Sequence, residues 1–246
     1  MPIHESVYRQ IKRFSAQQSS TPFGTLLAGF YILLNYLSRQ ADLVIGSHVA
    51  DQPLVGGHDL VGFCVNMIAL RSKIDEASKI EDYLSSVMKL VLEAHQHRSY
   101  PFARLVKRLR LQRDSSRAPL VTAIFNMDPP AIEPQFSELK VKAGPSPPIS
   151  ARFQLLWNVV ENGGGLLIKG EYNTDLFDGH TIQSWLQTYN SILEFMVSRP
   201  AATVGELTRS LAGEVRMQRA SMKGGLATGN APRLDRIRRR AIDYPD

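Results

Sequence analysis

The sequence predicts a layered α/β (α+β) domain in which helices cover a mixed sheet. Two observations favour this class: strand-like segments alternate with segments of helical periodicity, and two adjacent strands flank a hairpin signal. The chain has 246 residues, of which 43% are hydrophobic, so it can build a sizeable core. This length allows one large domain or two small ones.

The first fifth of the chain is predicted to form two helices and a strand. Residues 5–16 carry apolar side chains at helical spacing. A second helix over residues 22–38 begins with Thr21 and Pro22, which suit a cap and a first helical turn. This helix is apolar nearly all round, so we expect it to be deeply buried. The run DLVIGS at residues 42–47 ends in Gly and suits a central strand.

The middle of the chain alternates between strands and helices. Residues 51–58 contain Pro and Gly and are predicted to be a polar loop. Residues 63–72 are rich in apolar side chains and are predicted to be a strand. An amphipathic helix is expected over residues 80–96 and a shorter helix over residues 101–110. Residues 120–126 are again typical of a strand.

The last predicted elements are a hairpin and a long helix. A Pro-rich connector at residues 128–148 has little regular pattern. Strands are then predicted over residues 152–161 and 166–172, on either side of an Asn-Gly-Gly-Gly turn. Asp178 is expected to cap a helix over residues 181–197, because its carboxylate can accept hydrogen bonds from the free amides there.

Most of the positive charge lies at the C-terminal end. The whole chain has a net charge of +6, while residues 212–246 contain eight Lys and Arg and four acids, a net of +4. This segment is also rich in Gly. We therefore expect a domain over residues 1–211, followed by a basic, flexible tail or linker over residues 212–246. The tail has Tyr244 as its one aromatic residue, so nucleic-acid binding is not predicted.

No membrane or secretory segment is predicted. The longest apolar stretch, residues 26–37, is shorter than the roughly 18 residues of a membrane span, and residues 1–18 are polar and charged. Cys64 is the single cysteine, which excludes a disulfide framework and fits a reduced, cytoplasmic location. Because Cys64 lies in an apolar run, we expect it to be a small core residue.

The residues alone predict no catalytic centre and no metal site. None of the six histidines occurs in a HxxxH or HExxH arrangement, and Gly-x-Ser-x-Gly is absent. His95 and His97 are predicted to be solvated residues at a helix end. Composition and spacing therefore indicate a soluble α/β domain without catalytic residues of its own.

Three segments resemble motifs of the condensation domains of nonribosomal peptide synthetases. Residues 61–71 (VGFCVNMIALR) resemble a motif with a Gly-Phe-Phe-Val-Asn-Thr centre. Residues 97–102 (HRSYPF) match His-x-x-x-Pro-Phe, and residues 113–120 (RDSSRAPL) are similar to Arg-Asp-x-Ser-Arg-Asn-Pro-Leu. The motifs occur in the family's order and spacing, and the resemblance covers roughly residues 3–211.

The resemblance implies one lobe of a chloramphenicol-acetyltransferase-like fold. In this family two similar lobes surround a tunnel, where an amine attacks a thioester and an amide forms. The His-His-x-x-x-Asp-Gly motif of the active site belongs to the first lobe, and this chain has no adjacent histidine pair. The chain is thus expected to be the C-terminal lobe, inactive alone, with an N-terminal lobe and carrier-protein domains as partners. No directly bound cofactor is expected, because the substrates arrive on phosphopantetheine arms.

The resemblance also assigns roles to individual residues. Gly62, Phe63 and Asn66 are expected to line the channel. For Asn66 the alternative is an amide that satisfies backbone groups at a strand end. Structural roles are expected for the remaining motif residues, with an ion-pair network among the charged ones and a helix start at Pro-Phe: Arg71, Pro101, Phe102, Arg113, Asp114, Arg117 and Pro119.

Three hypotheses for function follow. The first is half of a condensation domain, present as a fragment or as a split protein. The second is a non-catalytic module that docks carrier proteins or neighbouring domains. The third is a self-sufficient acyltransferase that uses His48 or His97. For the first we also expect the isolated lobe to self-associate through its exposed apolar interface.

Overall fold

The computed structural model describes residues 1–50, 62–111, 118–128, 151–162 and 164–222. The predicted loop at residues 51–58, most of the connector at 128–148 and the tail beyond residue 222 lie outside them. The described part contains six strands, β1 (Pro2–Ile3), β2 (Asp42–Ala50), β3 (Val65–Lys73), β4 (Ala123–Asp128), β5 (Leu155–Asn162) and β6 (Gly165–Tyr172). Its helices are α1 (Glu5–Gln17), α2 (Pro22–Ser38), α3 (Ile80–Gln96), α4 (Phe102–Arg108), α5 (Gly179–Ser198) and α6 (Val204–Met222).

The strands form one mixed sheet, which confirms the predicted fold class. The strand order is β1-β6-β5-β4-β2-β3. β4 pairs in parallel with both β2 and β5, and the other neighbours are antiparallel. The β5–β6 pairing runs from Leu155 opposite Tyr172 to Asn162 opposite Gly165, so the predicted hairpin is confirmed. Its turn contains Gly164 at a φ of +87°, a conformation that Gly adopts without strain.

The main core lies between one face of the sheet and the helices α1, α2, α3 and α5. α2 is central and has most of its side chains buried, as predicted. Phe30 of α2 contacts Phe125 and Trp157 at ring-centroid distances of 5.1 and 5.0 Å. The Trp157 ring packs edge-on against Tyr189 of α5, which ties the helical layer to the sheet.

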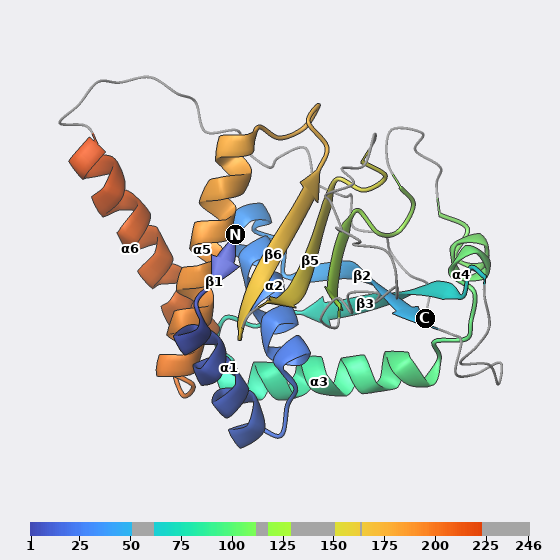
Figure 1. The fold of residues 1–246 in the computed structure, drawn as a ribbon, viewed down its shortest axis with the longest axis horizontal. Helices are drawn as coiled ribbons and strands as arrows, with labels where there is room; N and C mark the ends of the chain where they lie inside the picture. The colour runs from blue at the N-terminus through green and yellow to red at the C-terminus, as the bar shows by residue number, and fades with distance from the viewer. Residues whose placement is uncertain (51–61, 112–117, 129–150, 163, 223–246) are drawn as a thin grey trace, which may run out of the picture.

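A smaller core covers part of the opposite face. Leu120, Val121 and Ile124 form it together with half-buried residues of α4. Figure 1 shows α4 at the end of the sheet opposite to α5 and α6. Gly46 of β2 lies beneath this cluster, where an added Cβ would come within 2.4 Å of Ile124 Cδ1 and 2.7 Å of Val121 Cγ1. A residue with a Cβ would force these side chains to shift, so their close approach favours Gly at this position.

Three elements differ from the sequence prediction. β2 continues through Gly46 to Ala50, although the Gly predicted the end of the strand. β1 and α6 were not predicted at all. α6 extends from Val204 beyond residue 211 to Met222, and it buries Val204, Leu207 and Leu211.

Candidate functional site

Asn66, at the start of β3, fastens the loop between α3 and α4. Its Nδ2 donates hydrogen bonds to the carbonyl oxygens of Arg98 at 2.6 Å and Tyr100 at 2.9 Å. Its Oδ1 accepts a bond from the backbone N–H of Phe102 at 3.3 Å. The amide therefore satisfies backbone groups, as in the alternative role considered for it. A channel-lining role for Asn66 stays a prediction.

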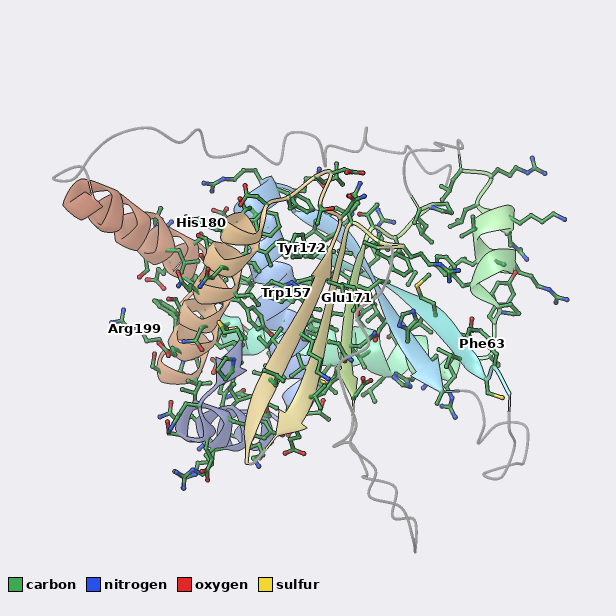
Figure 2. All side chains as sticks on the ribbon, turned by 45° about the horizontal axis from the view of Figure 1, so that its top comes forward. Phe63, Trp157, Glu171, Tyr172, His180 and Arg199 are labelled. Atoms are coloured by element: carbon green, nitrogen blue, oxygen red, sulfur yellow. The ribbon has the colours of Figure 1, made fainter. Side chains whose placement is uncertain are left out.

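Apolar side chains are exposed beside this fastened loop. Phe63 is 91% exposed, Val65 46% and Tyr100 43%, and we call these three residues the Phe63 surface. Figure 2 shows Phe63 at the end of the sheet away from α5 and α6. Gly62 next to it is exposed and has open space around its Cα. Large apolar side chains that are exposed together are typical of a surface that binds a partner.

Cys64 is not the core residue that its apolar neighbours predicted. It precedes β3 and is only half-buried, beside the exposed Phe63. The chain has not yet entered the sheet at this point, so no layer covers it. The expectation that Cys64 fills the core is therefore wrong.

α4 presents cations next to the Phe63 surface. Pro101 precedes the helix, and Phe102, its first residue, packs onto the smaller core. The sequence between His97 and Leu111 contains no acidic residue. Within the described ranges, none of its cations forms an ion pair, and Arg104, Lys107, Arg108 and Arg110 are all exposed. These cations were not predicted from the sequence to form a site.

The other motif residues lie apart from the Phe63 surface. Arg71 donates two hydrogen bonds to the carboxylate of Asp42, at 2.7 and 3.0 Å, which lowers the pKa of Asp42. Pro119 accepts a bond from Val121 N–H at 2.7 Å, across Leu120 at a φ of +66°. Residues 113, 114 and 117 lie outside the described part of the chain, so the network predicted for Arg113, Asp114 and Arg117 stays a prediction.

A row of polar side chains crosses the sheet face that α4 leaves open. Asn126 of β4 hydrogen-bonds to His48 of β2, and its register partner on β5, Asn158, donates to the carboxylate of Asp128. Burial is the main cause that lowers the pKa of His48, and Arg152 adds to it, while Asp128 opposes it. The sequence signal for this row is a single Asn inside an apolar strand, as in AIFNMD and LLWNVV.

The remaining chemistry is sparse in the described ranges. There, no group of three His, Cys, Asp or Glu side chains could hold a metal ion. His97 ends α3 and is exposed, whereas His95 is half-buried with a pKa lowered by burial and by Arg98. Among the same residues, no helix has the length and apolar character needed to cross a bilayer.

Comparison with known proteins identifies the family. The family model described as "Condensation domain" matches residues 2–217. One plipastatin synthase protein of Bacillus subtilis is 32% identical over 210 residues, which are 83% of this chain and 8% of that protein. One linear gramicidin synthase protein of Brevibacillus parabrevis is 34% identical over 193 residues, which are 77% of this chain and 2% of that protein. The chain thus spans a small part of these relatives.

Solved structures agree on the fold. A four-domain nonribosomal peptide synthetase bound to AMP and glycine superimposes with a TM-score of 0.76 at 23% identity, over 84% of this chain and 17% of that one. The X-domain from teicoplanin biosynthesis gives a TM-score of 0.76 at 20% identity, over 83% of this chain and 47% of that one. With the fold, the motifs and the family model in agreement, the chain belongs to the condensation domains of the nonribosomal peptide synthetases.

Proposed function

We propose that this chain is the second lobe of a condensation domain and helps to form an amide bond between carrier-bound substrates. The observation that carries the proposal is the family match over residues 2–217 in a sequence without an adjacent histidine pair. A partner lobe would supply the His-His-x-x-x-Asp-Gly motif. The match to about half of the X-domain chain supports the interpretation as one lobe of two.

In this proposal the chain binds and positions substrates and does no proton transfer of its own. Gly62, Phe63 and Asn66 form one wall of the channel, with Asn66 holding the α3–α4 loop at a fixed distance from β3. The amine attacks the thioester carbonyl, a C–N bond forms, the C–S bond breaks and the carrier thiol leaves. The amine proton passes to a base of the partner lobe, which returns it to the sulfur of the leaving thiolate.

The Phe63 surface and the cations of α4 are proposed to dock a carrier protein. Two exposed aromatic residues and the cations of α4, which form no ion pair with a described residue, suit a partner with an apolar patch rimmed by acids. A phosphopantetheine arm adds a phosphate anion to such a partner. The interaction is therefore expected to weaken as the salt concentration rises.

The proposed reaction is tested by adding the missing lobe. The 246-residue chain is co-expressed with a condensation-domain first lobe, and amide product from carrier-loaded substrates is measured by mass spectrometry. We expect product from the pair and none from the chain alone. Turnover by the isolated chain above the uncatalysed rate, or no product from a stable pair, would contradict the proposal.

The docking surface is tested by charge reversal. Arg104→Glu with Lys107→Glu is expected to weaken binding of a phosphopantetheinylated carrier domain about fivefold or more at low salt, measured by calorimetry. Arg13→Glu, at an exposed position of α1, is the control and should leave the affinity unchanged. If both variants bind the carrier domain with equal affinity, α4 is not part of the docking surface.

A non-catalytic docking module is the second candidate. The X-domain that this chain resembles was also solved as a complex with OxyB, and that match has a TM-score of 0.76 over 84% of this chain. The reading frame upstream of this chain distinguishes the two candidates. A His-His-x-x-x-Asp-Gly sequence there favours the amide-forming domain, and its absence favours the module.

Self-sufficient acyl transfer by this chain is the third candidate. It would need His48 or His97 as the base. Replacing His48 and His97 together by Ala tests it, since an unchanged activity excludes both residues.

A further inference from the structure

His48 and Asn126 meet on the sheet face over which the described residues place α4 as the one helix (Figure 1). β2 and β4 pair in parallel at Gly46 and Ile124, and His48 and Asn126 each lie two residues further along their strands. Their side chains therefore project from the same face as Gly46 and Ile124. His48 keeps an exposed surface on this face although neighbouring atoms partly bury its ring, and the ring of Phe153 lies 6.3 Å away in an edge-on orientation.

The two hydrogen bonds between these residues fix the orientation of the Asn126 amide. Oδ1 of Asn126 accepts the backbone N–H of His48 at 2.9 Å. A backbone N–H can only donate, so the oxygen must lie on this side and the NH₂ group on the other. Nδ2 of Asn126 then faces Nδ1 of His48 at 2.9 Å.

This orientation selects one tautomer of the His48 ring. Because Nδ2 of Asn126 can only donate, Nδ1 of His48 must carry the lone pair that accepts. The proton of the neutral ring is therefore on Nε2. A proton on Nδ1 would set two donors against each other, so the amide also disfavours the imidazolium form. The charged groups that act on the ring are Asp128 and Arg152.

The remaining nitrogen of the ring has no partner in the described part of the chain. No hydrogen bond joins Nε2 of His48 to any of these residues, so its N–H is an available donor on the open face. We propose that Asn126 is a positioning residue that holds His48 as a neutral Nε2–H donor to a carbonyl oxygen of the carrier-tethered substrate. The substrate part of this inference rests on the proposed function.

A carbonyl oxygen fits this donor better than an anion does. The ring is neutral, and the charges of Asp128 and Arg152 that act on it are opposite in sign, so no net positive charge at the ring favours an anion. The same geometry removes His48 from the candidates for a general base, since neither ring nitrogen has a lone pair available to substrate. His48 binds and orients, and it takes no proton.

The tautomer is tested on the 246-residue chain by ¹⁵N NMR of the histidine rings at neutral pH. We expect His48 to show a protonated Nε2 and a bare Nδ1. In Asn126→Asp one carboxylate oxygen keeps the bond from the His48 backbone, and the other accepts from Nδ1. The ring proton should then move to Nδ1. A protonated Nδ1 in the unmodified chain, or no change in Asn126→Asp, would overturn the inference.

The substrate contact is tested in the chain paired with its first lobe, through amide formation. His48→Phe removes the N–H group that donates the hydrogen bond. It should raise KM for the carrier-bound thioester substrate about three- to tenfold, with kcat little changed, as expected for the loss of one neutral hydrogen bond. Asn126→Asp should match it, and His48→Gln, which keeps an N–H donor, should restore most of the loss. Unchanged KM in His48→Phe would overturn the contact while the proposed function stands. An inactive unmodified pair would overturn the proposed function and the contact, and leave the tautomer as a separate result.

Discussion

Asn66 is the residue on which the shape of the Phe63 surface depends. Its three hydrogen bonds to backbone groups around Arg98, Tyr100 and Phe102 are all lost in Asn66→Ala. Because the half-buried Arg98 carbonyl and Phe102 N–H then lose their partner, we expect the free energy of unfolding to fall by about 1–3 kcal/mol. Urea denaturation measures this loss, and hydrogen exchange at the Phe102 amide should become faster.

Asn190→Ala provides the matched control for Asn66. Asn190 lies half-buried on α5, and within the described residues its amide donates one exposed hydrogen bond, to Glu194 one turn further along the helix. Its replacement should change stability by less than about 0.5 kcal/mol. If both variants lose the same stability, Asn66 does not fasten the loop.

His48 makes the stability of the chain depend on pH. Its pKa in the folded state is lowered from the ordinary value of 6.5, mainly by burial, so folding favours the neutral ring. The stability that this provides is fully present above pH 6.5 and is lost as the pH falls through the folded-state pKa. As the pH falls from 8 to 5, the unmodified chain should therefore lose more unfolding free energy than His48→Gln does. Urea denaturation at each pH measures this, and a difference in unfolding free energy that stays constant from pH 8 to 5 would contradict the prediction.

Among the elements, β2 and the smaller core depend on Gly46. In Gly46→Ala the new methyl group would overlap Ile124 and Val121, which are buried and held by their neighbours. We expect a loss of about 1–3 kcal/mol in unfolding free energy, as for an overpacked core. Gly213→Ala on α6 is the control, because open space surrounds that position and Ala favours a helix. If Gly46→Ala is as stable as the unmodified chain, the side chains of Ile124 and Val121 move aside without cost and the prediction is wrong.

The elements that could be predicted from sequence are those encoded by their own residues. The α2 helix has its cap at Thr21 and a long apolar run that only Asn35 interrupts between residues 26 and 37, and the β5–β6 hairpin has its glycines at the turn. Asp178 accepts from Thr181 N–H at 2.7 Å, so the cap expected for α5 is also present. Each of these signals lies within a few residues of the structure that it specifies.

The elements that were missed depend on distant contacts. α6 starts where the backbone N–H groups of Val204 and Gly205 donate to the carbonyl oxygens of Ser78 and Glu76, more than a hundred residues away. Three buried apolar residues among many polar ones gave only a weak helical signal. The strand was predicted to end near Gly46 because the sequence around Gly46 does not show what covers it. The side chains that fill the space above Gly46 come from β4 and from the residues just before β4. The Asn126–His48 pair likewise required the β2–β4 register.

At the scale of the whole molecule, the chain has surfaces that its own helices leave uncovered. One sheet face is covered by α1, α2, α3 and α5, whereas the described part of the other face has only α4 and a small core over it. The Phe63 surface adds exposed aromatic side chains at the α4 end. A lobe that normally packs against a partner would leave such areas exposed when it is alone.

We therefore expect the isolated chain to self-associate as its concentration rises, and light scattering coupled to size exclusion measures this. Phe63→Ser with Tyr100→Ser should shift the population toward monomer, because it removes the two exposed aromatic rings. Leu176→Ser, in the loop between β6 and α5, removes a single exposed apolar side chain elsewhere and should leave association unchanged. Adding the first lobe should likewise suppress self-association if both compete for one surface. A monodisperse monomer at every concentration tested would contradict the expectation, and equal effects of Phe63→Ser with Tyr100→Ser and of Leu176→Ser would place the contact elsewhere.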